Sequence, residues 1–159
     1  MTRSRLLLAL VVLASLAVAP LFAADNTFLG TWKLNTAKSK FTGAPAPKSL
    51  TRTVTAAGNG AKYSFEGTAA DGTAMSYSFT TNYDGKDVAI TGSGTPGGAD
   101  TITLKRVGNK TEGTLKKGGK EIGTAVSEVS KDGKMTTVKL KGKTADGKEF
   151  STESVYDKQ

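Results

Sequence analysis

The 159-residue chain contains no cysteine and no histidine. The absence of cysteine excludes disulfide bonds, so the fold must be held by its core and its hydrogen bonds alone. The absence of both residue types excludes the common zinc sites and every nucleophile system built on Cys or His. We therefore expect no metal ion, no cofactor and no catalytic residue, and we predict that the protein is not an enzyme.

Acidic side chains are scarce where acid–base catalysis would need them. Four of the eight aspartates stand directly before glycine, as in Asp71-Gly72 and Asp132-Gly133, which is the sequence pattern of tight turns. Glu128 alone is in register with an apolar strand face, that of Ile122 and Val126, and its place near a strand end predicts an exposed rim position.

The segment 92–97 matches a Gly-x-Gly-x-x-Gly nucleotide pattern, but a strand pattern follows it instead of the required helix, so we expect a loop over one barrel end.

Only one apolar run approaches the length of a membrane span. It extends over residues 6–19, follows two arginines and ends at Pro20 and the small residues Ala23 and Ala24. This pattern is typical of a secretory signal peptide, because the run is too short and wrongly flanked for a stable span. We predict a signal peptide over residues 1–24, with an uncleaved anchor as the alternative. The domain at residues 25–159 is then expected to be periplasmic or secreted, with no transmembrane segment of its own.

Positive charge in residues 25–159 comes almost entirely from lysine. This part of the chain holds 18 lysines and two arginines against 14 acidic residues. The lysines are spread along the sequence, which indicates a solvated surface, with a surface for polyanions such as lipid headgroups as the alternative. An exported chain without a basic–aromatic motif is not expected to bind nucleic acid. We expect a monomer.

Turn dipeptides such as Asn59-Gly60, Gly118-Gly119 and Asp146-Gly147 separate short runs of alternating apolar and polar residues. These dipeptides supply the positive φ of tight hairpins, and the alternating runs are typical of half-buried strands. We predict one helical turn within 36–41 and ten strands, at 28–34, 50–56, 62–68, 74–83, 86–91, 101–106, 110–116, 120–129, 135–142 and 148–156. A meander of that length closes to protect its edges, so the predicted fold class is all-β, an antiparallel up-and-down β-barrel.

Both arginines of residues 25–159 fall in register with apolar faces, as Leu50-x-Arg52-x-Val54 and as Ile102-x-Leu104-x-Arg106. A guanidinium is less strongly hydrated than an ammonium group, stacks on aromatic rings and binds carboxylates as a fork, so its inward placement is meaningful. In one interpretation an arginine stacks on Trp32 and plugs one end of the barrel. In a second, Arg52 or Arg106 is an internal anchor for an anionic ligand, and in a third neither arginine points inward.

The run Phe28-Leu29-Gly30-Thr31-Trp32-Lys33-Leu34 resembles the first strand of the calycins, the lipocalins and fatty-acid-binding proteins. The end of the chain, with Tyr156 followed by an acidic residue and Lys158, is similar to the ending of the fatty-acid-binding group. The chain also resembles small exported bacterial proteins called lipocalin-like. The resemblance implies a barrel whose end contains Gly30, Trp32 and Tyr156.

Two departures from the fatty-acid-binding group limit what the resemblance implies. The interval 35–49 is too short and too rich in proline for that group's two-helix lid, and Ser154 stands where it carries a carboxylate-binding arginine. We therefore predict a non-enzymatic binding protein for a small hydrophobic or anionic amphiphilic molecule, without naming a fatty acid. The predicted ligand-binding residues are Arg52, Arg106, Tyr63, Phe65, Tyr77, Phe79 and Phe150. The alternative is a periplasmic protein-interaction or inhibitor module that acts through its loops and Lys-rich outer face.

Overall fold

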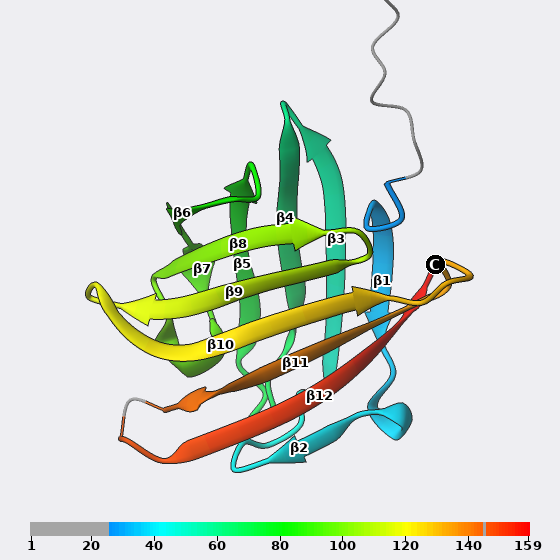
Figure 1. Cartoon of the computed structure of the whole chain (residues 1–159). Helices are drawn as coiled ribbons and strands as arrows, with labels where there is room; N and C mark the ends of the chain where they lie inside the picture. The colour runs from blue at the N-terminus through cyan, green and yellow to red at the C-terminus, as the bar shows by residue number, and fades with distance from the viewer. Residues whose placement is uncertain (1–25, 145) are drawn as a thin grey trace, which may run out of the picture.

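The computed structural model describes residues 26–144 and 146–159 (Figure 1). The predicted signal peptide lies outside the described residues. The described chain forms a 12-stranded antiparallel sheet and two short 3₁₀ turns. These elements are β1 (Gly30–Leu34), η1 (Thr36–Lys38), β2 (Lys40–Thr42), β3 (Ser49–Ala57), β4 (Gly60–Thr68), β5 (Ala74–Thr81), β6 (Asp84–Ala89), β7 (Thr91–Ser93), η2 (Pro96–Gly98), β8 (Thr101–Val107), β9 (Lys110–Lys117), β10 (Lys120–Val129), β11 (Met135–Lys143) and β12 (Glu149–Lys158).

The sheet curls into a nearly closed barrel. Its strand order is β6-β8-β9-β10-β11-β12-β1-β3-β4-β5-β7, and β2 pairs with β12. The first strand joins the two halves of the sheet, because β1 pairs with β12 on one edge and with β3 on the other. Figure 1 shows β3, β4 and β5 crossing steeply behind β8 to β12. The all-β, up-and-down antiparallel barrel predicted from the sequence is therefore confirmed, and it is the arrangement that the resemblance to calycins implied.

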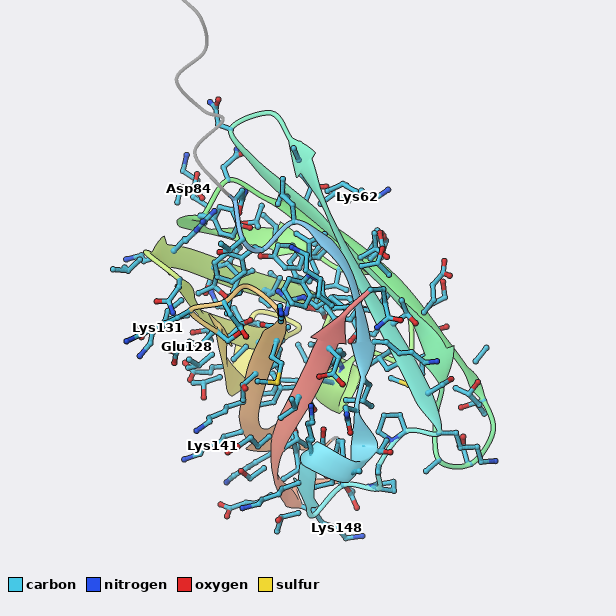
Figure 2. All side chains as sticks on the ribbon, turned by 90° about the vertical axis from the view of Figure 1, so that its right-hand side faces the viewer. Lys62, Asp84, Glu128, Lys131, Lys141 and Lys148 are labelled. Carbon is cyan, nitrogen blue, oxygen red and sulfur yellow. The ribbon has the colours of Figure 1, made fainter. Side chains whose placement is uncertain are left out.

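Side chains alternate between a packed interior and a charged exterior, as the sequence pattern predicted. The interior holds a continuous apolar cluster to which every one of the longer strands contributes. Charged residues such as Lys62, Lys131, Lys141 and Lys148 project outward from the ribbon (Figure 2). The outer surface is therefore wet, and any binding site for an apolar molecule lies inside.

The barrel departs from a simple meander between β5 and β8. The predicted strand at 86–91 does not pair with the strand before it. Instead, β6 pairs with β8, and after Ile90 the chain forms β7, which pairs with β5. Gly92 permits this switch, since its φ is +110° and a Cβ built on it would lie 2.1 Å from the Ser76 carbonyl oxygen. The segment 84–93 therefore brings the two edges of the sheet together, because its first part, β6, pairs with β8 and its last part, β7, pairs with β5.

A β-bulge changes which residues of β10 face inward. The β9–β10 register shifts between Glu121 and Gly123, so that Ala125, Ser127 and Val129 are buried. The predicted inward face of Thr124, Val126 and Glu128 is therefore wrong for this strand, since Thr124 and Glu128 are exposed. Glu128 does lie at an exposed position, as expected, and it pairs with Lys110 at 3.4 Å.

The predicted helical turn within 36–41 is shorter than expected. It is the 3₁₀ turn η1, capped by Asn35, whose side-chain oxygen accepts a hydrogen bond from the Lys38 backbone N–H at 3.1 Å. The chain then returns to β12 as strand β2, which the sequence analysis missed. The Pro-rich segment after β2 leads directly into β3 and leaves no room for a helical lid.

One end of the barrel is closed by aromatic and cationic side chains. Trp32 is fully buried, and its indole Nε1 donates a hydrogen bond to the Phe28 carbonyl at 3.0 Å. Lys158 Nζ lies 5.0 Å from the centre of the Trp32 ring, and the Arg106 guanidinium lies 4.7 Å from that of Phe28. The expectation that an arginine stacks on Trp32 is therefore wrong: Lys158, opposite Trp32 in the β1–β12 register, covers it. Gly30 makes room for this lysine, since a Cβ there would lie 2.9 Å from Lys158 Cε.

Candidate binding cavity

The barrel interior contains a cavity of about 230 Å³. Its deep part is lined by Arg52, Tyr63 and Tyr156, and its outer part by the loop after β2 and by the turn that contains Pro96 and Gly97. The predicted loop at 92–97 thus lines the mouth of the cavity.

One wall of the cavity is a ladder of aromatic rings on the inner faces of β4 and β5. Cross-strand pairing places Tyr63 opposite Phe79 and Phe65 opposite Tyr77. The rings stack at centroid distances of 4.9 Å and 4.6 Å, both with interplanar angles of 14°. At the deep end the hydroxyls of Tyr63 and Tyr83 form a hydrogen bond of 2.7 Å. The wall is thus a broad, rigid, apolar surface.

The other wall carries hydroxyl groups from β9, β10 and β12. These cavity-lining residues are Thr111, Ser127, Thr152, Ser154 and Tyr156, and all five are buried. Their positions follow from alternation along these strands, which also place Leu115, Ala125 and Phe150 inward. The cavity therefore has two chemically different walls, which we call the aromatic wall (Tyr63, Phe65, Tyr77, Phe79) and the hydroxyl wall.

Arg52 lies between the two walls and is only 2% exposed. Its guanidinium is 5.0 Å from the centre of the Tyr63 ring. Its Nη1 donates to Ser127 Oγ at 3.2 Å and, at the limit of hydrogen-bond length, to Thr136 Oγ1 at 3.5 Å. Its Nε has no hydrogen-bond partner. Among the described residues that line the cavity, Arg52 carries the only formal charge, so the guanidinium is buried without a carboxylate.

Burial also changes the tyrosines around this guanidinium. Desolvation raises the pKa of Tyr156 to about 12, although Arg52 and a hydrogen bond with Ser154 lower it in part. Desolvation likewise raises the pKa of Tyr77, an effect that Tyr156 strengthens and Arg52 weakens. Both phenols are therefore un-ionised hydrogen-bonding groups at neutral pH, and neither supplies the negative charge that Arg52 lacks.

The structure brings most of the predicted ligand-binding residues together. Arg52, Tyr63, Phe65, Tyr77, Phe79 and Phe150 all line the cavity. Arg106 does not: it lies at the closed end, where its Nη1 donates to Asn26 Oδ1 at 2.8 Å and its Nε donates to the Gly108 carbonyl at 3.2 Å. Tyr156, predicted as a barrel-end residue, is instead part of the cavity lining.

Alternation in the sequence places Thr152 and Ser154 on one strand face with Phe150 and Tyr156, but neither was predicted to bind ligand. The inward position of Ser127 was not predictable, because the bulge in β10 reverses the face on which it lies.

The described residues contain no helix that is both long and apolar enough to span a bilayer. They also contain no group of three or more acidic side chains placed to hold a metal ion.

Comparison with known proteins gives one similar structure. No family model matches the sequence, and no curated protein matches it. Among solved structures, the chain is similar to the zebrafish ileal bile acid-binding protein complexed with cholic acid, at 12% sequence identity and a TM-score of 0.48. The alignment covers 84% of this chain and 99% of that protein.

Proposed function

We propose that this protein is an exported, non-enzymatic binding protein that holds a small anionic amphiphile in its barrel cavity. The observation that carries the proposal is Arg52, a guanidinium that is 2% exposed, lines an apolar cavity and has no carboxylate partner. Burying an uncompensated charge is costly, so such a group is retained where a ligand supplies the opposite charge. The anionic head would bind at Arg52, and the apolar body would lie on the aromatic wall.

The unpartnered Nε of Arg52 supports this assignment. A carboxylate can accept hydrogen bonds from a guanidinium at two positions, and such charge-assisted bonds are stronger than neutral ones. Although Ser154 occupies the position at which the fatty-acid-binding group has an arginine, Arg52 provides a guanidinium beside Tyr156 from a different strand. Arg52 can therefore bind an anionic head group, although the carboxylate-binding arginine of the fatty-acid-binding group is absent.

The cavity is favoured over the Lys-rich outer face as the working surface. Six of the 18 lysines form ion pairs with aspartate or glutamate on the outer surface, where water also solvates the charges. No comparable pairing serves Arg52. Export remains part of the proposal on the strength of the N-terminal sequence pattern alone.

Isothermal titration with octanoate and 1-octanol tests the proposed function. We expect octanoate to bind to the wild type and to lose at least tenfold in affinity in Arg52→Met, because the charged head loses its partner. Octanol affinity should stay within about twofold in the same variant. The matched control is Arg106→Met, which removes the other arginine and should leave octanoate affinity unchanged. Equal octanoate binding by wild type and Arg52→Met would refute the anchor, and no binding of either probe would refute the cavity site.

A further inference from the structure

The aromatic wall and the hydroxyl wall lie on opposite sides of the cavity. The aromatic wall comes from β4 and β5, and the hydroxyl wall comes from β9, β10 and β12, which cross in front of them in Figure 1. The hydrogen bond from Arg52 on β3 to Ser127 on β10 spans the interior between the two groups of strands. A ligand in this cavity therefore meets aromatic rings on one side, and hydroxyl groups interspersed with apolar side chains on the other.

The hydroxyl wall has unused hydrogen-bonding capacity. Thr152 Oγ1 is buried and has no hydrogen-bond partner, and it shares this state only with Arg52 Nε among the described side chains. A buried polar group without a partner is unfavourable, and covering it with an alkyl chain leaves the cost in place. A ligand whose edge carries a hydroxyl or a similar group removes that cost.

The size of the cavity limits the ligand. A volume of about 230 Å³ corresponds to roughly eight molecules of liquid water at about 30 Å³ each. This space suits a single ring with a carboxylate and one further small substituent, and a long alkyl chain would have to leave through the mouth. The rings of the aromatic wall stack on one another in pairs, so they present mainly their edges to the cavity, and a ligand ring can pack against these edges in an edge-to-face contact.

The charge of the cavity limits the ligand further. Among the described lining residues, Arg52 is the only charged one. A monoanion neutralises this charge, whereas a dianion would bring a second buried charge without a partner.

From these observations, and resting on the function proposed above, we propose that the ligand is a small ring-bearing monocarboxylate with a hydrogen-bonding edge, and not a straight-chain fatty acid. Its carboxylate binds Arg52, its ring packs against the aromatic wall, and its polar edge donates to or accepts from the hydroxyl wall at Thr152. The residues that select the ring and its edge are therefore Thr152, Phe65 and Tyr77, and Arg52 selects the charge.

Three probes with equal numbers of non-hydrogen atoms test this proposal by isothermal titration: 4-hydroxybenzoate, octanoate and 4-hydroxybenzamide. We expect 4-hydroxybenzoate to bind at least tenfold more tightly than octanoate, because only the ring compound uses both walls. The neutral amide should bind at least tenfold more weakly than 4-hydroxybenzoate. If octanoate binds as tightly as 4-hydroxybenzoate or more so, and depends on Arg52, the ring-bearing ligand is refuted while the proposed function stands. If neither anion binds, both fail.

A conservative variant separates a hydrogen bond at the hydroxyl wall from a structural effect. Thr152→Val keeps the shape of the side chain and removes its hydroxyl, so we expect about a tenfold loss for 4-hydroxybenzoate and no loss for octanoate. Thr124→Val, on the exposed face of β10, is the matched control and should change neither affinity. An equal loss for both probes in Thr152→Val would mean that the residue only supports the fold, and would overturn its assigned role.

Discussion

Replacing Arg52 by methionine should stabilise the protein while it weakens ligand binding. The guanidinium is 2% exposed and has no carboxylate partner, so its transfer from water costs several kcal/mol. Against this cost stand one charge-assisted hydrogen bond to Ser127 at 3.2 Å, worth about 1.5–3 kcal/mol, and the stacking on Tyr63, worth about 2 kcal/mol. Methionine has a similar length and keeps the apolar packing of the stem.

The hydroxyls that Arg52 contacts keep partners after the change. Ser127 Oγ and Thr136 Oγ1 lie 3.3 Å apart, and Thr136 Oγ1 also donates to the Glu128 carbonyl at 3.2 Å. Replacement of a buried ion pair by apolar residues of similar volume stabilises proteins by roughly 1–4 kcal/mol, and we expect an effect of this size for the unpaired guanidinium. For a domain of this size, we expect a rise of about 3–10 °C in Tm. Stability sacrificed for function is a common property of binding sites.

Thermal melts followed by circular dichroism, together with urea titrations, measure this effect. Arg106→Met is the control: it loses the hydrogen bond to Asn26 at 2.8 Å and the stacking on Phe28, and should be destabilised by about 1–3 kcal/mol with unchanged ligand affinity. If Arg52→Met melts lower than the wild type and binds octanoate equally well, then Arg52 is a structural plug and the reasoning fails.

Three further predictions concern the barrel and the predicted signal peptide. Gly30→Ala should destabilise the fold by about 1–3 kcal/mol in urea titrations, because φ there is +131° and the new Cβ would contact Lys158; an unchanged midpoint would contradict the described packing. Burial raises the pKa of Tyr156 to about 12, so the un-ionised phenol contributes stability that is complete below pH 10 and lost as the pH rises towards 12. Between these pH values the wild type should lose up to about 3 kcal/mol more stability than Tyr156→Phe. Equal losses in the two proteins would refute this prediction. Protein recovered from the periplasm or medium should begin at Ala24 or Asp25 by intact mass, whereas a chain that retains residues 1–24 would refute cleavage.

The fold could be predicted because its signals are local. Pairs such as Asp132-Gly133 and Gly118-Gly119 mark hairpins, and the alternation Leu50-x-Arg52-x-Val54 is enough to place Arg52 inside the barrel. A departure from alternation was invisible at this level. The bulge near Gly123 reverses the inward face of β10, and only the pairing of β9 with β10 reveals it.

The site was predictable in its residue types but not in its contacts. The aromatic wall follows from the inward positions of β4 and β5, whose cross-strand pairs are neighbours in a hairpin. The partners of Arg52 and of Trp32 come from distant strands: Ser127 is 75 residues away from Arg52, and Lys158 reaches Trp32 only because β12 pairs with β1. Such contacts depend on how the barrel closes, which no local pattern determines.

A crystal structure of the protein with 4-hydroxybenzoate tests the central claim most directly, namely that the cavity receives an anion at Arg52. We predict the carboxylate within about 3 Å of Arg52 Nε and the ring between the aromatic wall and Thr152. If the protein is saturated with the compound but the compound lies on the outer lysines and not in the cavity, the claim is contradicted.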